Sequence, residues 1–321
     1  MTLLESVPNV SEGRVSAAVD AIAAAFAVAG ATVVDVHSDA DHNRSVITLL
    51  GGERQLEDGL VAGIAEARQR IDLRRHVGVH PRVGVVDVLP VVPLTADDLP
   101  RALSVAEAVA RRVGAELDVP VFLYGELGAG RRPAFFRRGG LEELGRRVDE
   151  FELRPAHGPP SLDPRSGAAL VGVRSLLVAY NLELVGSLET ARQVAESVRE
   201  SSGGLPGVQA LGLAIGDRVV QVSTNLVDVD ATPLHVLVER IVAEAAMRGA
   251  AVGAGELVGL LPARCVVAAA RAVGVGSTDA GRGELLSPAA LDAAARAFRL
   301  DRLAVDRVLE WHVERVTAER R

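Results

Sequence analysis

The sequence predicts an α/β (α+β) protein made of two subdomains. Short β-branched runs alternate with longer segments whose apolar residues recur at helical spacing. The order strand-helix-strand-strand-helix-strand, which is the split βαβ (βαββαβ, ferredoxin-like) order, occurs twice along the chain. We expect two sheets that face each other with helices outside, because ligands commonly bind in the cleft that such an arrangement leaves.

The first subdomain is expected to span residues 1–174. Strands are predicted at 3–7, 32–36, 45–50, 83–92 and 119–124, and helices at 11–29, 53–70, 95–117 and in a short stretch that ends near 150. A polar loop at 39–43 joins two strands, and a loop rich in Gly and Arg is expected at 125–140. Residues 154–167 are rich in Pro and Gly, which indicates a loop near a domain boundary.

The second subdomain is expected to span residues 175–321. Strands are predicted at 175–185, 208–215, 219–225 and 251–260, and helices at 188–201 and 233–247. Gly216-Asp217 is a hairpin signal between two of these strands. The chain after Pro262 is expected to be mostly helical, with a last helix at 302–315.

The composition favours an anionic ligand. All 35 basic residues are arginine because the sequence contains no lysine. A phosphate-binding Walker loop and Schiff-base chemistry both need a lysine, so neither is expected. Arginine suits the bidentate capture of carboxylates.

The net charge of −7 and an aromatic content of 3% argue against a nucleic-acid partner. No apolar run reaches the roughly 18 residues of a membrane helix, and no signal peptide is expected at the N-terminus. The single cysteine, Cys265, suits a reducing cytoplasm and is interpreted as a buried side chain within a helix.

Four of the seven histidines lie between positions 37 and 80, in two clusters. The second cluster, His76 to Gly84, directly precedes a buried strand. A histidine there suits general acid/base catalysis because its ordinary pKa lies near neutrality, and Arg82 is close enough in sequence to bind an anion beside it. A hydrogen-bonded turn histidine is the alternative.

The first cluster, Asp35 to Arg44, lies in the region of the predicted polar loop. His37, Asp39, Asp41 and His42 carry suitable ligand atoms for a metal, which His76 or His80 can join. Acids that alternate in a loop are often only turn and capping groups, so both interpretations stand.

Three other places show the same ambiguity between a ligand site and a local cap or turn. Asn9 or Ser11 can cap the first helix, whose free amides can hold a carboxylate. The loop from Ser161 to Gly167 and the strand-end residues Asn181 and Asn225 can either contact a ligand or finish a turn.

The sequence resembles the formiminotransferase domain, which also forms the N-terminal part of formiminotransferase-cyclodeaminase. The most specific stretch is IDLRRHVGVHPRVGVVDVLP at 71–90. The other matching stretches are VPNVSEG at 7–13, DVHSDADHNRSV at 35–46, VPVFLYGE at 119–126, VGVRSLLVAYNLEL at 171–184, GLPGVQALGL at 204–213, QVSTNL at 221–226 and ELVGLLP at 256–262. The stretch after about 265 matches weakly.

The resemblance implies roles for individual residues. The catalytic histidine of the family lies in its HPR motif, which makes His80 the catalytic residue here. The resemblance and the clusters together give the candidate substrate- or folate-binding residues Asn9, His37, Asp39, Asn43, Arg44, Arg82, Ser161, Gly167 and Gly212. No metal is expected. Some members carry an acid where His37 stands, which leaves a carboxylate role at that position open.

The resemblance implies transfer of a formimino group from N-formimino-L-glutamate to N5 of tetrahydrofolate, the co-substrate, in histidine degradation. The fold it implies has a folate tunnel between the sheets, completed by the second subdomain. A homodimer is expected, and no cyclodeaminase domain is expected. Three alternatives stay open: formyl transfer from N-formylglutamate, a metal-dependent amidohydrolase, and a folate-binding protein without catalysis.

Overall fold

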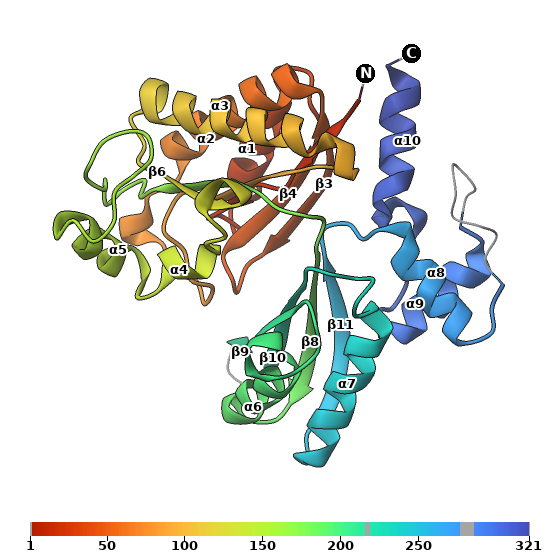
Figure 1. Cartoon of the computed structure of the whole chain (residues 1–321). Coiled ribbons are helices and arrows are strands. Elements are labelled where there is room, and N and C mark those ends of the chain that lie inside the picture. The colour runs from red at the N-terminus through yellow and green to blue at the C-terminus, as the bar shows by residue number, and fades with distance from the viewer. Residues whose placement is uncertain (1, 216–218, 277–285, 321) are drawn as a thin grey trace. The chain divides into compact units, whose positions relative to one another are not determined.

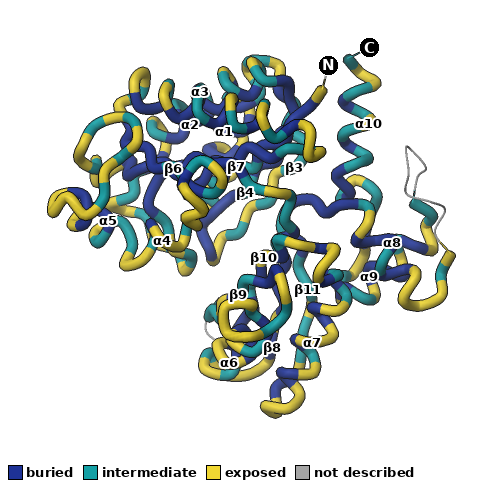
Figure 2. The backbone as a smooth tube through the Cα atoms, viewed as in Figure 1, coloured by how far each residue is buried: buried dark blue, intermediate teal, exposed yellow. Residues whose placement is uncertain are grey.

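The computed structural model describes residues 2–215, 219–276 and 286–320. The chain forms two compact units, Met1–Ser175 and Leu176–Arg321. Each unit has its own sheet and its own buried core (Figures 1 and 2). The predicted mixed α/β class with two sheets is therefore confirmed.

The described part of the first unit contains a seven-stranded mixed sheet. Its strands are β1 (Leu4–Ser6), β2 (Asn9–Val10), β3 (Thr32–Asp39), β4 (Arg44–Gly51), β5 (Val86–Val92), β6 (Val121–Gly125) and β7 (Ala169–Val173). The interrupted strand β1/β2 lies between β4 and β5 and is antiparallel to both, and β3 pairs with β4. These strands have the ferredoxin-like arrangement, and β7 and β6 extend it by parallel pairing beyond β5.

Strand β7 was not predicted, because the expected strand at the domain boundary begins at 175. The structure instead places a strand at Ala169–Val173, between β5 and β6, and all of its residues are buried. A short apolar run after a Gly- and Pro-rich loop gives little periodic signal, and its pairing partners lie far away in sequence.

Helices cover the two faces of this sheet unequally. The helices α1 (Ser16–Ala27), α2 (Glu53–Arg70) and α3 (Leu99–Leu117) pack together on one face (Figure 1). The short helices α4 (Pro133–Arg137) and α5 (Gly140–Asp149) enclose a smaller core on the other face, against Val88, Phe122 and Leu170. The 3-10 helices of this unit are Leu73–Arg75, Ala96–Asp98 and Glu126–Gly128.

Helix α1 begins at Ser16, so the predicted start at Ser11 is wrong. Ser11 is not a helix cap, because its hydroxyl donates to Gly84 O at 2.7 Å and its amide donates to Val85 O at 2.8 Å. The carboxylate of Glu12 accepts from the amides of Arg14 and Val15 just before the helix. The segment before α1 is therefore held against the chain that leads into β5.

The second unit has a four-stranded antiparallel sheet in the order β11-β8-β10-β9. Its elements are β8 (Val178–Val185), α6 (Leu188–Val198), β9 (Val208–Ile215), β10 (Val219–Leu226), α7 (Leu234–Met247) and β11 (Ala251–Val258), with a 3-10 helix at Glu200–Ser202. This is the predicted ferredoxin-like order. The predicted hairpin turn at Gly216-Asp217 lies outside the described residues.

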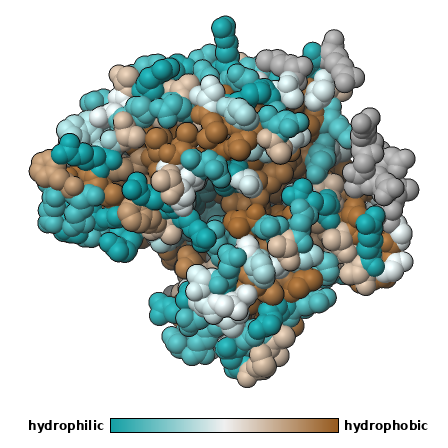
Figure 3. Space-filling view, viewed as in Figure 1, coloured by the Kyte–Doolittle hydropathy of each residue, from teal (hydrophilic) through white to brown (hydrophobic). Residues whose placement is uncertain are grey.

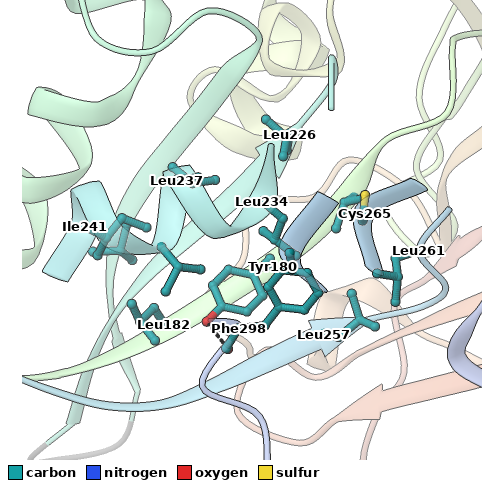
Figure 4. Packing of buried hydrophobic residues seen from close by; sticks show 14 of the residues in the cluster. Tyr180, Leu182, Leu226, Leu234, Leu237, Ile241, Leu257, Leu261, Cys265 and Phe298 are labelled. Carbon is teal, nitrogen blue, oxygen red and sulfur yellow. Dashed lines mark hydrogen bonds between the residues drawn. The ribbon is translucent and has the colours of Figure 1, made fainter. Parts of the chain in front are cut away.

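The chain after β11 adds the helices α8 (Ala263–Ala272), α9 (Pro288–Ala297) and α10 (Leu309–Glu319) and a 3-10 helix at Val305–Arg307. The last helix begins at Leu309 and not at 302 as predicted. Cys265 lies in α8 within the core of the unit, as predicted, and burial raises its pKa to about 12 (Figure 4). Tyr180 joins α9 to the sheet by donating its hydroxyl to Phe298 O at 2.7 Å.

The face of the molecule shown in Figure 3 mixes hydrophilic and hydrophobic residues. Such mixing is usual, since a folded chain has too little polar surface to cover itself. Among the helices in the described ranges, none has the length and apolar character needed to cross a membrane.

Candidate active site

The candidate site lies on the face of the first sheet that α1–α3 leave uncovered. Val10 in β2 and Ile47 in β4 belong to the core beneath these helices. Because side chains alternate along a strand, Asn9 and Arg44 point to the opposite face. His37 on β3 pairs with Val46 and shares this face.

Arg44 is the centre of a buried polar network. Its guanidinium donates to Asn9 Oδ1 through Nε at 3.1 Å and Nη2 at 2.8 Å, and to Asp87 Oδ2 through Nη1 at 2.9 Å. Burial and the nearby charge of Arg137 lower the pKa of Arg44 to about 10, although Asp87 opposes them. Arg44 is therefore a fixed cation at neutral pH.

His80 lies beside this network, directly before β5. Its Nδ1 is 2.8 Å from Pro81 O and 3.3 Å from Arg44 Nη1. A carbonyl oxygen only accepts, so the shorter contact assigns the proton to Nδ1. Nε2 then carries the lone pair and can act as a base.

The surroundings of His80 favour the neutral imidazole. Burial, and then the positive charges of Arg44 and Arg137, lower the pKa of His80 well below its ordinary value, against the opposing effect of Asp87. A base that is neutral at physiological pH can accept a proton without first losing one. The geometry therefore suits general base catalysis at Nε2.

Arg82 binds backbone carbonyls of the histidine clusters. Its guanidinium donates to His42 O at 2.6 Å, to Asn43 O at 2.9 Å and to His80 O at 2.9 Å. The ring nitrogens of His76 lie 2.9 and 2.7 Å from Arg82 Nη1. Arg82 thus holds the loop before β4 and the loop before β5 together, and its predicted contact with a substrate carboxylate stays a prediction.

Asn43 shapes the turn between β3 and β4. Its φ is 46°, in the left-handed region that asparagine tolerates better than most residues. Its side chain accepts from Gly13 N and donates to Val77 O, both at 3.0 Å. Asn43 therefore positions Arg44 by connecting three segments of the chain.

The first histidine cluster is more regular than predicted, because β3 continues to Asp39. His37 and Asp39 therefore lie on a strand and not in a loop. Asp39 Oδ2 is 3.1 Å from Nδ1 of His42, and Asp39 Oδ1 accepts from the amides of Asp41 and His42 at 2.8 Å. Burial alone would raise the pKa of Asp39, but these hydrogen bonds and the charge of His42 lower it to about 2.

The metal alternative has no ligand set in the residues that the structure covers. Within them, no group of three or more His, Cys, Asp or Glu side chains is arranged to hold a metal ion. The acids of the first cluster cap amides and pair with His42 instead, as described above. A metal-dependent amidohydrolase is therefore not favoured.

The predicted folate loop from Ser161 to Gly167 lies next to the chain that carries His80. Gly167 forms a bridge with Gly84, and Ala168 N donates to Val83 O at 2.8 Å. A Cβ on Gly167 would lie 2.1 Å from Val83 O, so only glycine allows this approach. Ser161 is exposed at the start of the loop.

Gly212, Asn181 and Asn225 belong to the second unit. A Cβ on Gly212 would lie 2.4 Å from Arg192 N, so this glycine lets α6 pack closely on β9. Asn181 donates to Glu256 Oε2 at 2.9 Å, and Asn225 is exposed on β10. A folate contact at Gly212 stays a prediction.

Two residues of the network were missed by the sequence analysis. Asp87 is fully buried and accepts from Arg44, from Arg137 Nη2 on α4 and from Val83 N at 2.8 Å. Burial alone would raise the pKa of Asp87, but Arg137 and Arg44 lower it to about 2. A single acid within the apolar run 83–92 was the available signal, since such a charge needs a partner.

Comparison with known proteins gives the family. The model of the formiminotransferase domain, N-terminal subdomain, matches residues 3–174, and the model of the formiminotransferase domain matches residues 179–273. A glutamate formimidoyltransferase of Streptococcus pyogenes is 34% identical over 83% of this chain and 91% of its own length. A protein of that name from Thermoplasma acidophilum is 37% identical over 84% of this chain and 92% of its own length.

The formimidoyltransferase-cyclodeaminase of Sus scrofa is 37% identical over 84% of this chain. The match covers 52% of that relative, so this chain corresponds to about half of it. The two family models together cover most of the chain, and the HPR motif with its buried arginine network lies within the first match. The chain therefore belongs to the formiminotransferase family.

Proposed function

We infer that this protein is a glutamate formimidoyltransferase, which transfers the formimino group of N-formimino-L-glutamate to N5 of tetrahydrofolate. The names of the two relatives that align over most of their length support this inference. The observation that carries it is the state of His80. Its Nδ1 is held by Pro81 O, and its pKa is lowered by burial beside fixed arginines.

In the proposed reaction, N5 of tetrahydrofolate attacks the formimino carbon. His80 Nε2 removes the proton from N5, and a proton then reaches the amine nitrogen of the departing glutamate. The products are L-glutamate and 5-formimino-tetrahydrofolate. Positioning both substrates at one site makes the attack effectively intramolecular.

We further propose that Arg44 and Arg82 help to bind carboxylates, together with Asn9, His37, Asp39 and Asn43 on the same unit. Planar guanidinium groups suit carboxylates, and Arg44 stays charged because its lowered pKa is still about 10. Ser161, Gly167 and Gly212 are proposed to contact folate. We also propose a cytoplasmic homodimer that acts in histidine degradation without a metal.

The test is turnover by the purified chain with tetrahydrofolate and N-formimino-L-glutamate, in which free glutamate and the folate adduct are both quantified. Equal amounts of the two products without added metal are expected. N-formyl-L-glutamate is the comparison donor, and faster turnover of it would favour formyl transfer. Tetrahydrofolate binding without either product would contradict the proposed reaction and favour a binding protein.

Replacing His80 with Ala is expected to abolish transfer while folate binding is largely retained, because the base is lost and the arginine network is not. Steady-state turnover and the dissociation constant of tetrahydrofolate measure the two effects. His157→Ala is the control, because His157 lies outside the site and pairs with Glu107 at 2.9 Å. Unchanged turnover in His80→Ala would remove this residue from the mechanism.

A further inference from the structure

A second histidine lies beside His80 and is held by a carboxylate. The rings of His42 and His80 are 6.0 Å apart between centroids and meet edge to face at 71°. His42 is only 6% exposed, and its Nδ1 is 3.1 Å from Asp39 Oδ2. The backbone at His42 is fixed as well, since its carbonyl accepts from Arg82 and its amide donates to Asp39.

The other ring nitrogen of His42 is unused. Nε2 is buried and has no hydrogen-bond partner among the residues that the structure describes. A buried polar atom without a partner costs free energy, so such atoms are rare unless they have a function. The carboxylate of Asp39 binds the proton on Nδ1, which directs chemistry to Nε2 and stabilises the charged imidazolium.

The proposed transfer needs one group that takes a proton and one that gives a proton. His80 suits the first task because its surroundings favour the neutral ring, whereas His42 has a carboxylate partner that favours the protonated ring. Two titratable groups in contrasting environments commonly divide acid and base roles. Resting on the proposed function, we propose that His42, oriented by Asp39, is a second catalytic residue and the general acid that protonates the departing glutamate nitrogen.

The step is balanced as follows. After attack, His80 holds the proton from N5, and the tetrahedral carbon carries N5, a hydrogen, the amino group derived from the formimino nitrogen, and the glutamate nitrogen. His42 Nε2–H gives its proton to the glutamate nitrogen as the bond from that nitrogen to carbon breaks, and the electron pair stays on glutamate. The lone pair of the amino group re-forms the C=N bond, and a proton then passes from His80 to His42.

The test compares two donors in the His42→Gln variant. N-formimino-L-glutamate has a basic leaving amine that must be protonated, whereas the fluorines of N-formimino-4,4-difluoro-L-glutamate make its amine less basic and keep both carboxylates. Loss of a general acid is expected to lower kcat by about a hundredfold with the first donor. A much smaller loss is expected with the fluorinated donor.

His76→Gln is the matched control, because His76 also lies among the clusters, contacts Arg82 and accepts or donates at Asn43 O at 3.1 Å. It is expected to change kcat for both donors by the same factor. Asp39→Asn provides a second variant if His42→Gln does not fold, because it keeps the shape of the side chain but no longer favours the proton on Nδ1. It is expected to show the same dependence on the donor.

Equal losses with both donors in His42→Gln, or in Asp39→Asn, would overturn the role of His42 and leave the proposed transfer intact. No transfer by the unaltered protein with either donor would overturn the proposed function and this role together. The larger loss with the more basic leaving group would support it, since a residue that only holds the fold has no reason to distinguish the two amines.

Discussion

At the scale of single residues, charge decides how His80 behaves. An imidazole in water titrates near neutrality, but His80 is surrounded by fixed cations that Asp87 holds in place. The carboxylate of Asp87 itself is kept ionised by Arg44 and Arg137. The base is thus prepared by two side chains that need not touch the substrate.

Arg137→Gln is expected to move the acid limb of kcat/KM to higher pH. The charge of Arg137 lowers the pKa of His80, so its removal raises that pKa toward the ordinary value and protonates the base at a higher pH. In the unaltered protein the acid limb should lie well below pH 6.5. The pH dependence of kcat/KM in both proteins measures the difference.

Arg146→Gln is the control for this prediction, because Arg146 pairs with Glu143 on the surface of α5. Its profile should match that of the unaltered protein. The same pKa shift affects stability. Below about pH 6.5 the unfolded chain binds the proton of His80 and the folded chain does not, so stability falls as pH drops toward the folded pKa. An acid limb that stays in place in Arg137→Gln would contradict the electrostatic role of this arginine.

At the scale of elements, the loop that precedes β7 is joined to the chain that precedes β5. Gly167 has a φ of +69° and faces Val83 O, so a side chain there meets both backbone strain and a direct clash. The contact holds the loop from Ser161 to Gly167 against the segment of the HPR motif.

Gly167→Ala is therefore expected to lower the free energy of unfolding and to raise KM for tetrahydrofolate. Gly130→Ala is the matched control, because Gly130 has a φ of +74° and nothing within 4 Å of an added Cβ. The control should lose about 1 kcal/mol from backbone strain alone. Gly167→Ala should lose a further 1–3 kcal/mol, roughly, from the clash. Equal losses in urea unfolding would show that the close approach is unimportant.

At the scale of the whole molecule, the two units have separate cores. The largest cluster of buried apolar residues, around Tyr180 and Phe298, lies entirely within Leu176–Arg321, and the cores on both faces of the first sheet lie within Met1–Ser175. A domain with its own hydrophobic core can in principle fold alone.

The fragment 176–321 is expected to fold by itself and to unfold cooperatively in urea, with a free energy in the usual range of about 5–15 kcal/mol. Circular dichroism against urea concentration measures this. The fragment is expected to lack transferase activity because it lacks His80. A broad, non-cooperative transition would mean that its core depends on the first unit.

The sequence by itself determined the class of fold, the ferredoxin-like order of each unit, and the motif that carries His80. These features are local, because periodic burial and turn residues are recorded directly along the chain. The burial of Cys265 followed from the same kind of local pattern.

Only the tertiary structure decided which distant residues meet. It inserted β7 beside β5, moved the start of α1 to Ser16, and brought Arg137 of α4 to Asp87. It also placed His42 next to His80, although both were visible in the sequence. Strand pairing and buried ion pairs depend on contacts between segments far apart in the chain, and neither leaves a periodic signal in one sequence.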